Sequence, residues 1–157
     1  RAEYVSVANL MKQTTYEVSL TYPSTIRDSG NSPTITNYVL YRKGSKVKTV
    51  TGGVSEYCDE SKGHCANLDF LVLFNPTSSE TYTKTSDRTI AGKSATCFIA
   101  KPTNPDVPAW VKHERCFEKT TGAPVYFNGP VMAIRDTIIS ATQFSTTVSD
   151  AEVTPSV

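Results

Sequence analysis

The sequence lacks the features that several common classes of protein require. Its longest apolar runs stop well short of the roughly 18 residues of a membrane-spanning helix. Sixteen basic and fifteen acidic residues leave a net charge of +1, so the basic excess of a nucleic-acid binder is missing. No signal peptide is visible, and the chain opens at Arg1 without an initiator Met. We therefore expect a processed N-terminus, with any signal or anchor absent from this sequence.

The motifs of catalysis and metal binding are also missing. There is no Gly-x-Ser-x-Gly elbow, no Cys-x-x-Cys pair and no EF-hand spacing, and only His64 and His113 supply imidazoles. The acidic group Asp59-Glu60, with Asp69 beyond it, can be interpreted as a cation site or as a solvated acidic turn, and the turn is favoured. The sequence thus predicts no enzyme, no cofactor and no metal.

The chain does contain four cysteines, an even set that indicates disulfides and an oxidising compartment. They are Cys58, Cys65, Cys97 and Cys116, which allow three connectivities. Local pairing, 58 with 65 and 97 with 116, fits best because each pair lies on chain that turns back on itself. In the chain-entropy view, loops of these lengths contribute roughly 2.5 and 3.3 kcal/mol.

Alternating apolar residues predict strands in the first third of the chain. Tyr16, Val18, Leu20 and Tyr22 alternate with polar residues and end at Pro23. Residues 35–43 and 46–52 flank Gly44-Ser45 and are typical of a hairpin. The basic group at residues 42–48 brackets that turn, and we expect it to be a solvated hairpin tip.

Helical signals occur at the N-terminus and in mid-chain. Residues 2–12 place Val7 at helical spacing from Leu10 and Met11, which predicts a helix packed through these three side chains. The run 67–74 fits a buried strand or a short helix, and two short helices are preferred here, the second beginning at residues 78–80. The tail after Asp150 is expected to be loose.

The later part of the chain, residues 88–153, consists of short runs rich in Val, Ile, Thr, Phe and Tyr, separated by Gly, Pro and Asn. Such a composition is typical of an antiparallel meander. With 157 residues, the chain is expected to form a single, mainly β (α+β) domain: a helix, about four strands, a helical insert, and four or five further strands.

Short motifs in this region resemble a known group. They are Cys97-Phe98, Cys116-Phe117, Gly-Ala-Pro-Val at 122–125, and the ending at 149–155. Together with the order of elements, they resemble the LolA-like superfamily of extracytoplasmic lipoprotein carriers and lipid-carrying lipoproteins of the LppX and LprG type. Val153 stands where that family often has Phe. No lipobox Cys is present, so a lipid anchor would lie upstream of Arg1.

The resemblance implies a strongly curved antiparallel sheet, an incomplete barrel, with the N-terminal helix and the mid-chain helices as a lid over a cavity for acyl chains. It implies an extracellular or cell-surface carrier for an acyl chain, lipid or lipidated protein, with a membrane surface or protein partner possible. In such a fold the lining residues, taken from two strands and the lid, are Tyr16, Val18, Leu20, Tyr22, Tyr38, Leu40, Leu68, Leu71 and Phe74.

The alternative is a structural or adhesive surface protein, such as a filament subunit that self-assembles by strand exchange. A terminal segment that leaves its own domain would favour that alternative. Trp110, on a Pro-rich loop, either anchors a partner or membrane surface, or folds back to cap the sheet. The numerous tyrosines are interpreted as strand residues with hydroxyls at the rim, or as a pocket lining.

Overall fold

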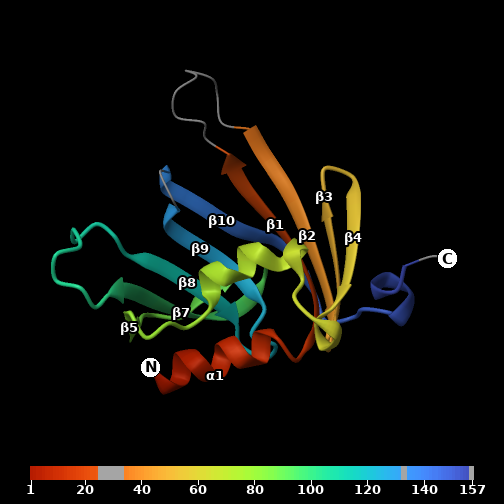
Figure 1. The fold of residues 1–157 in the computed structure, drawn as a ribbon, viewed down its shortest axis with the longest axis horizontal. Coiled ribbons are helices and arrows are strands. Elements are labelled where there is room, and N and C mark those ends of the chain that lie inside the picture. Colours follow the sequence, from red (N-terminus) through yellow and green to blue (C-terminus); the bar gives the residue numbers. More distant parts are fainter. Residues whose placement is uncertain (25–33, 132–133, 156–157) are drawn as a thin grey trace.

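One curved antiparallel sheet dominates the structure, a computed structural model that describes residues 1–24, 34–131 and 134–155 (Figure 1). The sheet has ten strands in the order β4-β3-β2-β1-β10-β9-β8-β7-β5, with β6 paired to β7. It does not close into a barrel. Helix α1 and the 3₁₀ segment η2 lie across its concave side. The predicted fold class, an incomplete antiparallel barrel with a helical cover, is confirmed.

The strands follow the chain as two neighbouring groups. The first group is β1 (Thr15–Ser24), β2 (Thr34–Lys43), β3 (Lys46–Thr51) and β4 (Val54–Asp59). The second is β5 (Glu80–Lys84), β6 (Arg88–Ile90), β7 (Lys93–Pro102), β8 (His113–Glu118), β9 (Pro124–Val131) and β10 (Ile134–Ser145). The groups join where β1 pairs with β10, so the first and last strands meet in the middle of the sheet.

Helix α1 (Ala2–Met11) packs through a stripe of spacing i, i+3, i+4, i+7. The stripe consists of Tyr4, Val7, Ala8 and Met11, all buried. The expectation that Leu10 also packs inward is wrong, because its side chain is 37% exposed. At about 100° per residue, Leu10 lies roughly 110° from the centre of this stripe.

The turn between β8 and β9 packs directly against α1. Gly122 has a positive φ of 70°, and a Cβ there would lie 2.6 Å from the Val7 carbonyl oxygen and 2.7 Å from the Met11 nitrogen. The buried Glu118 carboxylate holds this turn by accepting hydrogen bonds from the backbone N–H groups of Thr120 and Thr121. The close approach of α1 therefore depends on glycine at this position.

The mid-chain insert is only partly as predicted. Residues 60–62 form η1 (Glu60–Lys62), and the run 66–74 forms η2 (Ala66–Phe74), a 3₁₀ helix ended by Asn75-Pro76. The second expected helix, at residues 78–80, is wrong: the chain enters strand β5 and pairs with β7. The Thr-Tyr-Thr composition of β5 favours that pairing over helix.

Two further expectations need correction. The predicted hairpin of β2 and β3 is present, but Arg42 is fully buried rather than solvated, because it pairs with Glu60 at 2.6 Å. The tail is not loose up to residue 153. There, η3 (Asp150–Val153) begins with a capping box between Ser149 and Glu152, and Val153 is buried.

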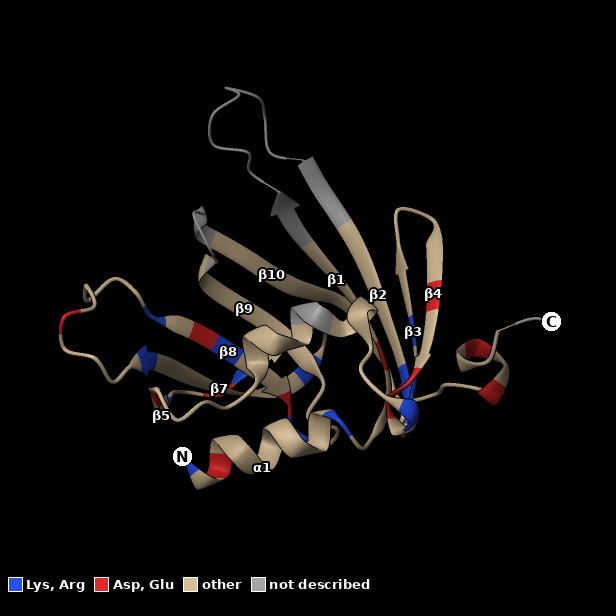
Figure 2. Cartoon of the chain, viewed as in Figure 1, with Lys and Arg blue, Asp and Glu red and all other residues tan. Residues whose placement is uncertain are grey.

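The structure joins Cys58 to Cys65 and Cys97 to Cys116, the two pairs preferred from the sequence. Cys97 and Cys116 face each other at register positions of β7 and β8. Acidic and basic residues are interspersed along the chain, with mixed charges where β2, β3 and β4 approach η1 (Figure 2). Within the described ranges, no helix has the length and apolarity needed to cross a membrane.

Candidate functional site

The concave face of the sheet and the two segments above it form one apolar layer. Val18 lies opposite Leu40, and Leu20 lies opposite Tyr38, so β1 and β2 present their apolar residues to the same side. The predicted lining residues that belong to one buried cluster are Tyr16, Val18, Leu20, Tyr38, Leu40, Leu68, Leu71 and Phe74. The side chain of Tyr22 falls outside the described side chains. The structure thus brings the other predicted residues of β1, β2 and η2 together in one buried layer.

Tyrosine hydroxyls tie the cover to the sheet and to itself. Tyr38 of β2 donates to the Asn67 carbonyl at 3.1 Å, and Tyr16 of β1 donates to the Met11 carbonyl at 2.7 Å. Tyr4 of α1 donates to the Phe74 carbonyl at 2.6 Å, which joins α1 to η2. Burial raises the pKa of Tyr16 to about 12, although the nearby Arg42 guanidinium acts in the opposite direction. The Tyr16 hydroxyl therefore remains a protonated donor at neutral pH.

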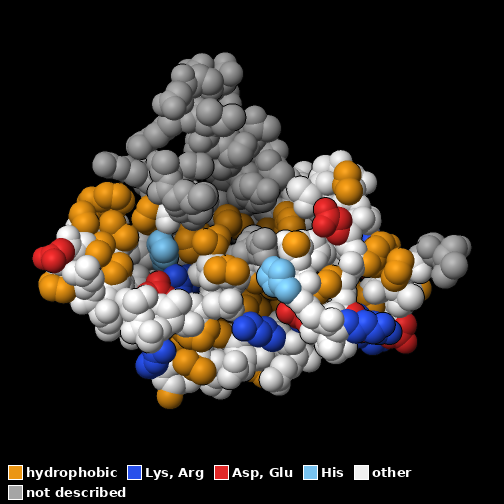
Figure 3. All heavy atoms as spheres, in the orientation of Figure 1, with side chains coloured by type: hydrophobic (Ala, Val, Ile, Leu, Met, Phe, Trp, Pro, Cys, Tyr) orange, Lys and Arg blue, Asp and Glu red, His pale blue; other side chains and the backbone are white. Residues whose placement is uncertain are grey.

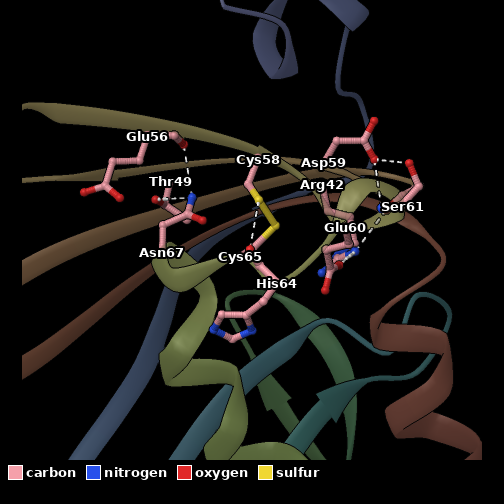
Figure 4. The surroundings of a disulfide bond; sticks show 11 residues. Arg42, Thr49, Glu56, Cys58, Asp59, Glu60, Ser61, His64, Cys65 and Asn67 are labelled. Atoms are coloured by element: carbon pink, nitrogen blue, oxygen red, sulfur yellow. Dashed lines mark hydrogen bonds and ion pairs between the residues drawn. A yellow bond between two sulfur atoms is a disulfide. The ribbon is translucent and has the colours of Figure 1, made fainter.

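The start of η2 is anchored by a disulfide and an amide. The Cys58–Cys65 bond links the end of β4 to the residue before η2, and Asn67 donates to Thr49 Oγ1 at 3.0 Å and to the Glu56 carbonyl at 3.2 Å (Figure 4). A 3₁₀ helix has poorer internal hydrogen bonds than an α-helix. These side-chain attachments therefore add to the burial of its apolar residues in holding η2 in place.

A buried ionic cluster lies beside the N-terminal part of α1. Arg115 of β8, which is 3% exposed, donates to both carboxylate oxygens of Glu80 at 3.1 and 2.8 Å, and to the Tyr4 hydroxyl at 2.9 Å. The ring of Tyr82 stacks on Tyr4 with centroids 3.9 Å apart. His113 Nδ1 accepts from Arg115 at 3.0 Å. The cluster connects α1, β5 and β8.

The pKa values of the groups in this cluster are shifted by burial and by the neighbouring charges. Burial opposes ionisation of Glu80, but the hydrogen bonds and charge of Arg115 outweigh it, so the pKa of Glu80 is lowered. Burial, and then the Arg115 charge, lower the pKa of His113. Its Nε2 lies 2.8 Å from the Pro130 carbonyl, which only an N–H can satisfy. His113 is therefore neutral, with its proton on Nε2, at neutral pH.

A second buried arginine lies at the other end of the cover, at the end of α1. Arg42 Nη1 donates to the carbonyls of Lys12 and Gly44, both at 3.0 Å, in addition to Glu60. A cavity of about 160 Å³ adjoins this pair. Its lining residues are Lys12, Arg42, Glu60, Gly63, His64, Cys65, Leu68, Leu71, Val72 and Asn75.

The described groups that could act as metal ligands take part in a disulfide, a helix cap and an ion pair instead. Cys97, Glu114 and Cys116 come within 4.8 Å of one another, but the two sulfurs are bonded together and are not available as thiolates. Asp59, one of the acidic residues considered for a cation, accepts from Ser61 N at 3.0 Å and caps η1. Glu60 pairs with Arg42 instead.

The sequence interpretation missed both buried arginines, although a signal was present. Arg42 has the same parity as Leu40 and Tyr38 in β2, and Arg115 has the same parity as Phe117 in β8. Period-two alternation therefore places both guanidinium groups on the concave side. A charged residue at an inward position of an amphipathic strand predicts a buried ion pair.

Some apolar surface remains exposed on this face. Figure 3 shows hydrophobic side chains gathered around η2 and on the loop between β7 and β8. Val72 of η2 is 60% exposed, and Trp110 of the loop is 50% exposed. Trp110 is thus half buried and half exposed.

Comparison with solved structures shows the fold. A structure of MucB in complex with MucA(peri) matches with a TM-score of 0.67 at 14% identity, covering 99% of this chain and 59% of that one. The MucA/MucB complex of Pseudomonas aeruginosa matches with a TM-score of 0.64 at 11% identity, covering 99% and 60%. The present chain thus spans about three fifths of the length of these MucB chains.

A LolA superfamily protein from Nitrosomonas europaea matches with a TM-score of 0.36 at 10% identity, covering 98% of this chain and 97% of that one. No protein-family model and no curated protein matches the chain. At identities of 11% and 14%, the likeness to the MucB structures concerns the fold alone.

Proposed function

We propose that this protein is an extracytoplasmic carrier that binds an acyl chain, either of a lipid or of a lipidated protein, on the concave face of its sheet. The observation that supports this most directly is the construction of the cover. An extensive apolar face is closed by one α-helix and one 3₁₀ segment, and each is attached to the sheet through a few tyrosine, asparagine and arginine hydrogen bonds.

The free energy needed to open the cover is similar in size to the free energy gained by burying an acyl chain. Lifting η2 breaks hydrogen bonds worth about 1 kcal/mol each and exposes Leu68, Leu71 and Phe74 at roughly 2 kcal/mol each. Burying about ten methylenes of an acyl chain gains roughly 8 kcal/mol. The two quantities are of the same order. A ligand can therefore replace the cover's own apolar contacts, and release can occur when the cover closes again.

The two disulfides support a location outside the cytoplasm, because such bonds persist in oxidising compartments. The fold likeness supports a protein partner too, since two MucB structures of this fold are complexes with MucA. A lipidated protein as cargo would add surface contacts of its polypeptide to those of the buried chain.

The alternative of a filament subunit requires a terminal segment to pair with another copy. In the structure, α1 packs on its own sheet through Tyr4 and Met11, and η3 buries Val153. Both terminal segments are thus engaged within their own chain. This arrangement supports the carrier proposal over strand exchange.

The test is ligand binding with a matched pair of variants. Native mass spectrometry of gently purified protein should show a lipid-sized adduct, and a fluorescent fatty acid should bind with a Kd of about 1 μM. Leu40→Trp fills the buried face and should weaken binding at least tenfold. Val54→Trp, at an edge-strand residue 61% exposed, should leave binding unchanged.

Circular dichroism must show that both variants are folded, since overpacking at Leu40 costs typically 1–3 kcal/mol. Absence of an adduct together with absence of fatty-acid binding at about 100 μM would refute the carrier proposal. Filaments seen under the same conditions would favour the structural alternative.

A further inference from the structure

The Arg42 guanidinium has an unused binding edge. Its Nη1 serves Glu60 and the carbonyls of Lys12 and Gly44, whereas Nε and Nη2 are buried and have no hydrogen-bond partner among the described residues. Buried N–H groups of a charged side chain are rarely left unpaired, because losing their hydrogen bonds is costly. The Nε–Nη2 edge is a planar fork whose two N–H groups match the two oxygens of a carboxylate.

The adjoining cavity combines a polar end with an apolar wall. Leu68 and Leu71, both predicted as ligand-lining residues, face it together with Arg42 and Lys12. An apolar wall next to the unpaired N–H donors of Arg42 is what an amphiphile with an anionic head requires.

The charge and size of the cavity favour a small monoanion. Its Lys and Arg side chains carry two positive charges and Glu60 carries one negative charge, which leaves a net charge of +1. Glu60 already engages one nitrogen of Arg42, and the five N–H donors of arginine allow a second acceptor on the free edge. A volume of about 160 Å³ holds a carboxylate and the first carbons of a chain.

We propose that the acyl chain bound by this protein carries a free carboxylate, which pairs with the Nε–Nη2 edge of Arg42. The cargo is then a long-chain fatty acid, held by its head at the η1–η2 end of the cover. This inference rests on the proposed function, because it names the head group of the same ligand. The Arg42 side chain is fully covered in the closed structure. The carboxylate therefore reaches it only when the η1–η2 segment moves outward.

The experiment compares oleate with methyl oleate, which has the same chain but no charge. Affinities are measured by displacement of a fluorescent probe from the wild-type protein. Oleate should bind at least about tenfold more tightly than the ester, the gain expected of a charge-assisted bidentate pair. Arg42→Met should abolish this preference through lost affinity for oleate, with the ester unaffected. Arg88→Met changes an ion-paired arginine on β6, away from the cavity, and should keep the preference.

The outcomes distinguish a failure of the carboxylate site from a failure of the carrier function. Equal affinity of the wild-type protein for oleate and methyl oleate would overturn the carboxylate site and leave the carrier function standing. Failure of both to bind would refute the carrier function itself. If Arg42→Met does not fold, Arg42→Lys retains the charge without the fork and should reduce the preference; an unreduced preference in that folded variant would overturn the role of Arg42.

Discussion

Removing Arg115 should destabilise the fold more than any surface substitution. Arg115→Met keeps a side chain of similar length but leaves the Glu80 carboxylate, whose side chain is 13% exposed, without its guanidinium. Breaking a buried ion pair by deleting one partner typically costs 3–5 kcal/mol. Glu80 retains a hydrogen bond from the Tyr82 hydroxyl at 3.0 Å. We therefore expect a loss at the lower end, about 3 kcal/mol.

The assay is urea unfolding followed by circular dichroism, with a double-mutant cycle. Glu80→Gln alone should cost about 2 kcal/mol, because it leaves Arg115 charged and buried. The double variant should be little worse than Arg115→Met, which corresponds to a coupling energy of about 2 kcal/mol. For a domain of this size, the Arg115 variant should melt roughly 6–12 °C lower than the wild type.

The matched control is Arg88→Met. Arg88 pairs with Glu114 at the same 2.8 Å distance, but its side chain is 42% exposed, so its loss should cost less than about 1 kcal/mol. Equal effects of the two arginine variants would refute the argument from burial. Additive costs in the cycle would show that Arg115 and Glu80 do not act as a pair.

Three further expectations follow from the cover and its support. Met11→Asp should cost about 3 kcal/mol and Leu10→Asp less than about 1 kcal/mol in urea unfolding, because only Met11 is buried; equal costs would mean that α1 is not docked as described. Gly122→Ala should cost about 2 kcal/mol and increase amide exchange in α1, since its Cβ would meet the helix backbone; unchanged exchange would contradict this contact. Because the pKa of His113 is lowered in the folded protein, the unfolded chain binds a proton more readily. The contribution of His113 to the free energy of unfolding is therefore fully present above its ordinary pKa of about 6.5. This contribution declines as the pH falls below that value, by at most about 1.4 kcal/mol per pH unit. His113→Gln should remove that part of the slope, and an unchanged slope would exclude His113 as its source.

Much of the fold was predictable because its determinants are local. Alternation from Tyr16 to Leu20 identifies β1, and the Gly44-Ser45 turn identifies the β2–β3 hairpin. Helical spacing from Tyr4 to Met11 identifies α1. Residues close in sequence determine each of these patterns. The same holds for the disulfides, whose partners lie 7 and 19 residues apart.

Predictions from local sequence patterns were wrong where the same residues fit two local arrangements. The chain after Asn75-Pro76 carries helix-start residues, yet it forms β5, because an unpaired edge of β7 lies beside it. Leu10 fits the helical spacing from Val7, yet it points away from the sheet. In the first case the choice depended on which neighbour was present, and a single sequence does not state this. In the second case, Leu10 lies outside the buried stripe of α1.

The sequence by itself determined which residues face inward, through period two in the strands and period 3.6 in α1. Only the tertiary structure decided what the inward polar groups meet. Arg115 finds Glu80 and Tyr4, 35 and 111 residues away, while Arg42 finds the end of α1 30 residues away. The physical reason is that apolar burial is non-directional and can be read from pattern, whereas a buried charge is stable only with specific partners at hydrogen-bonding distance.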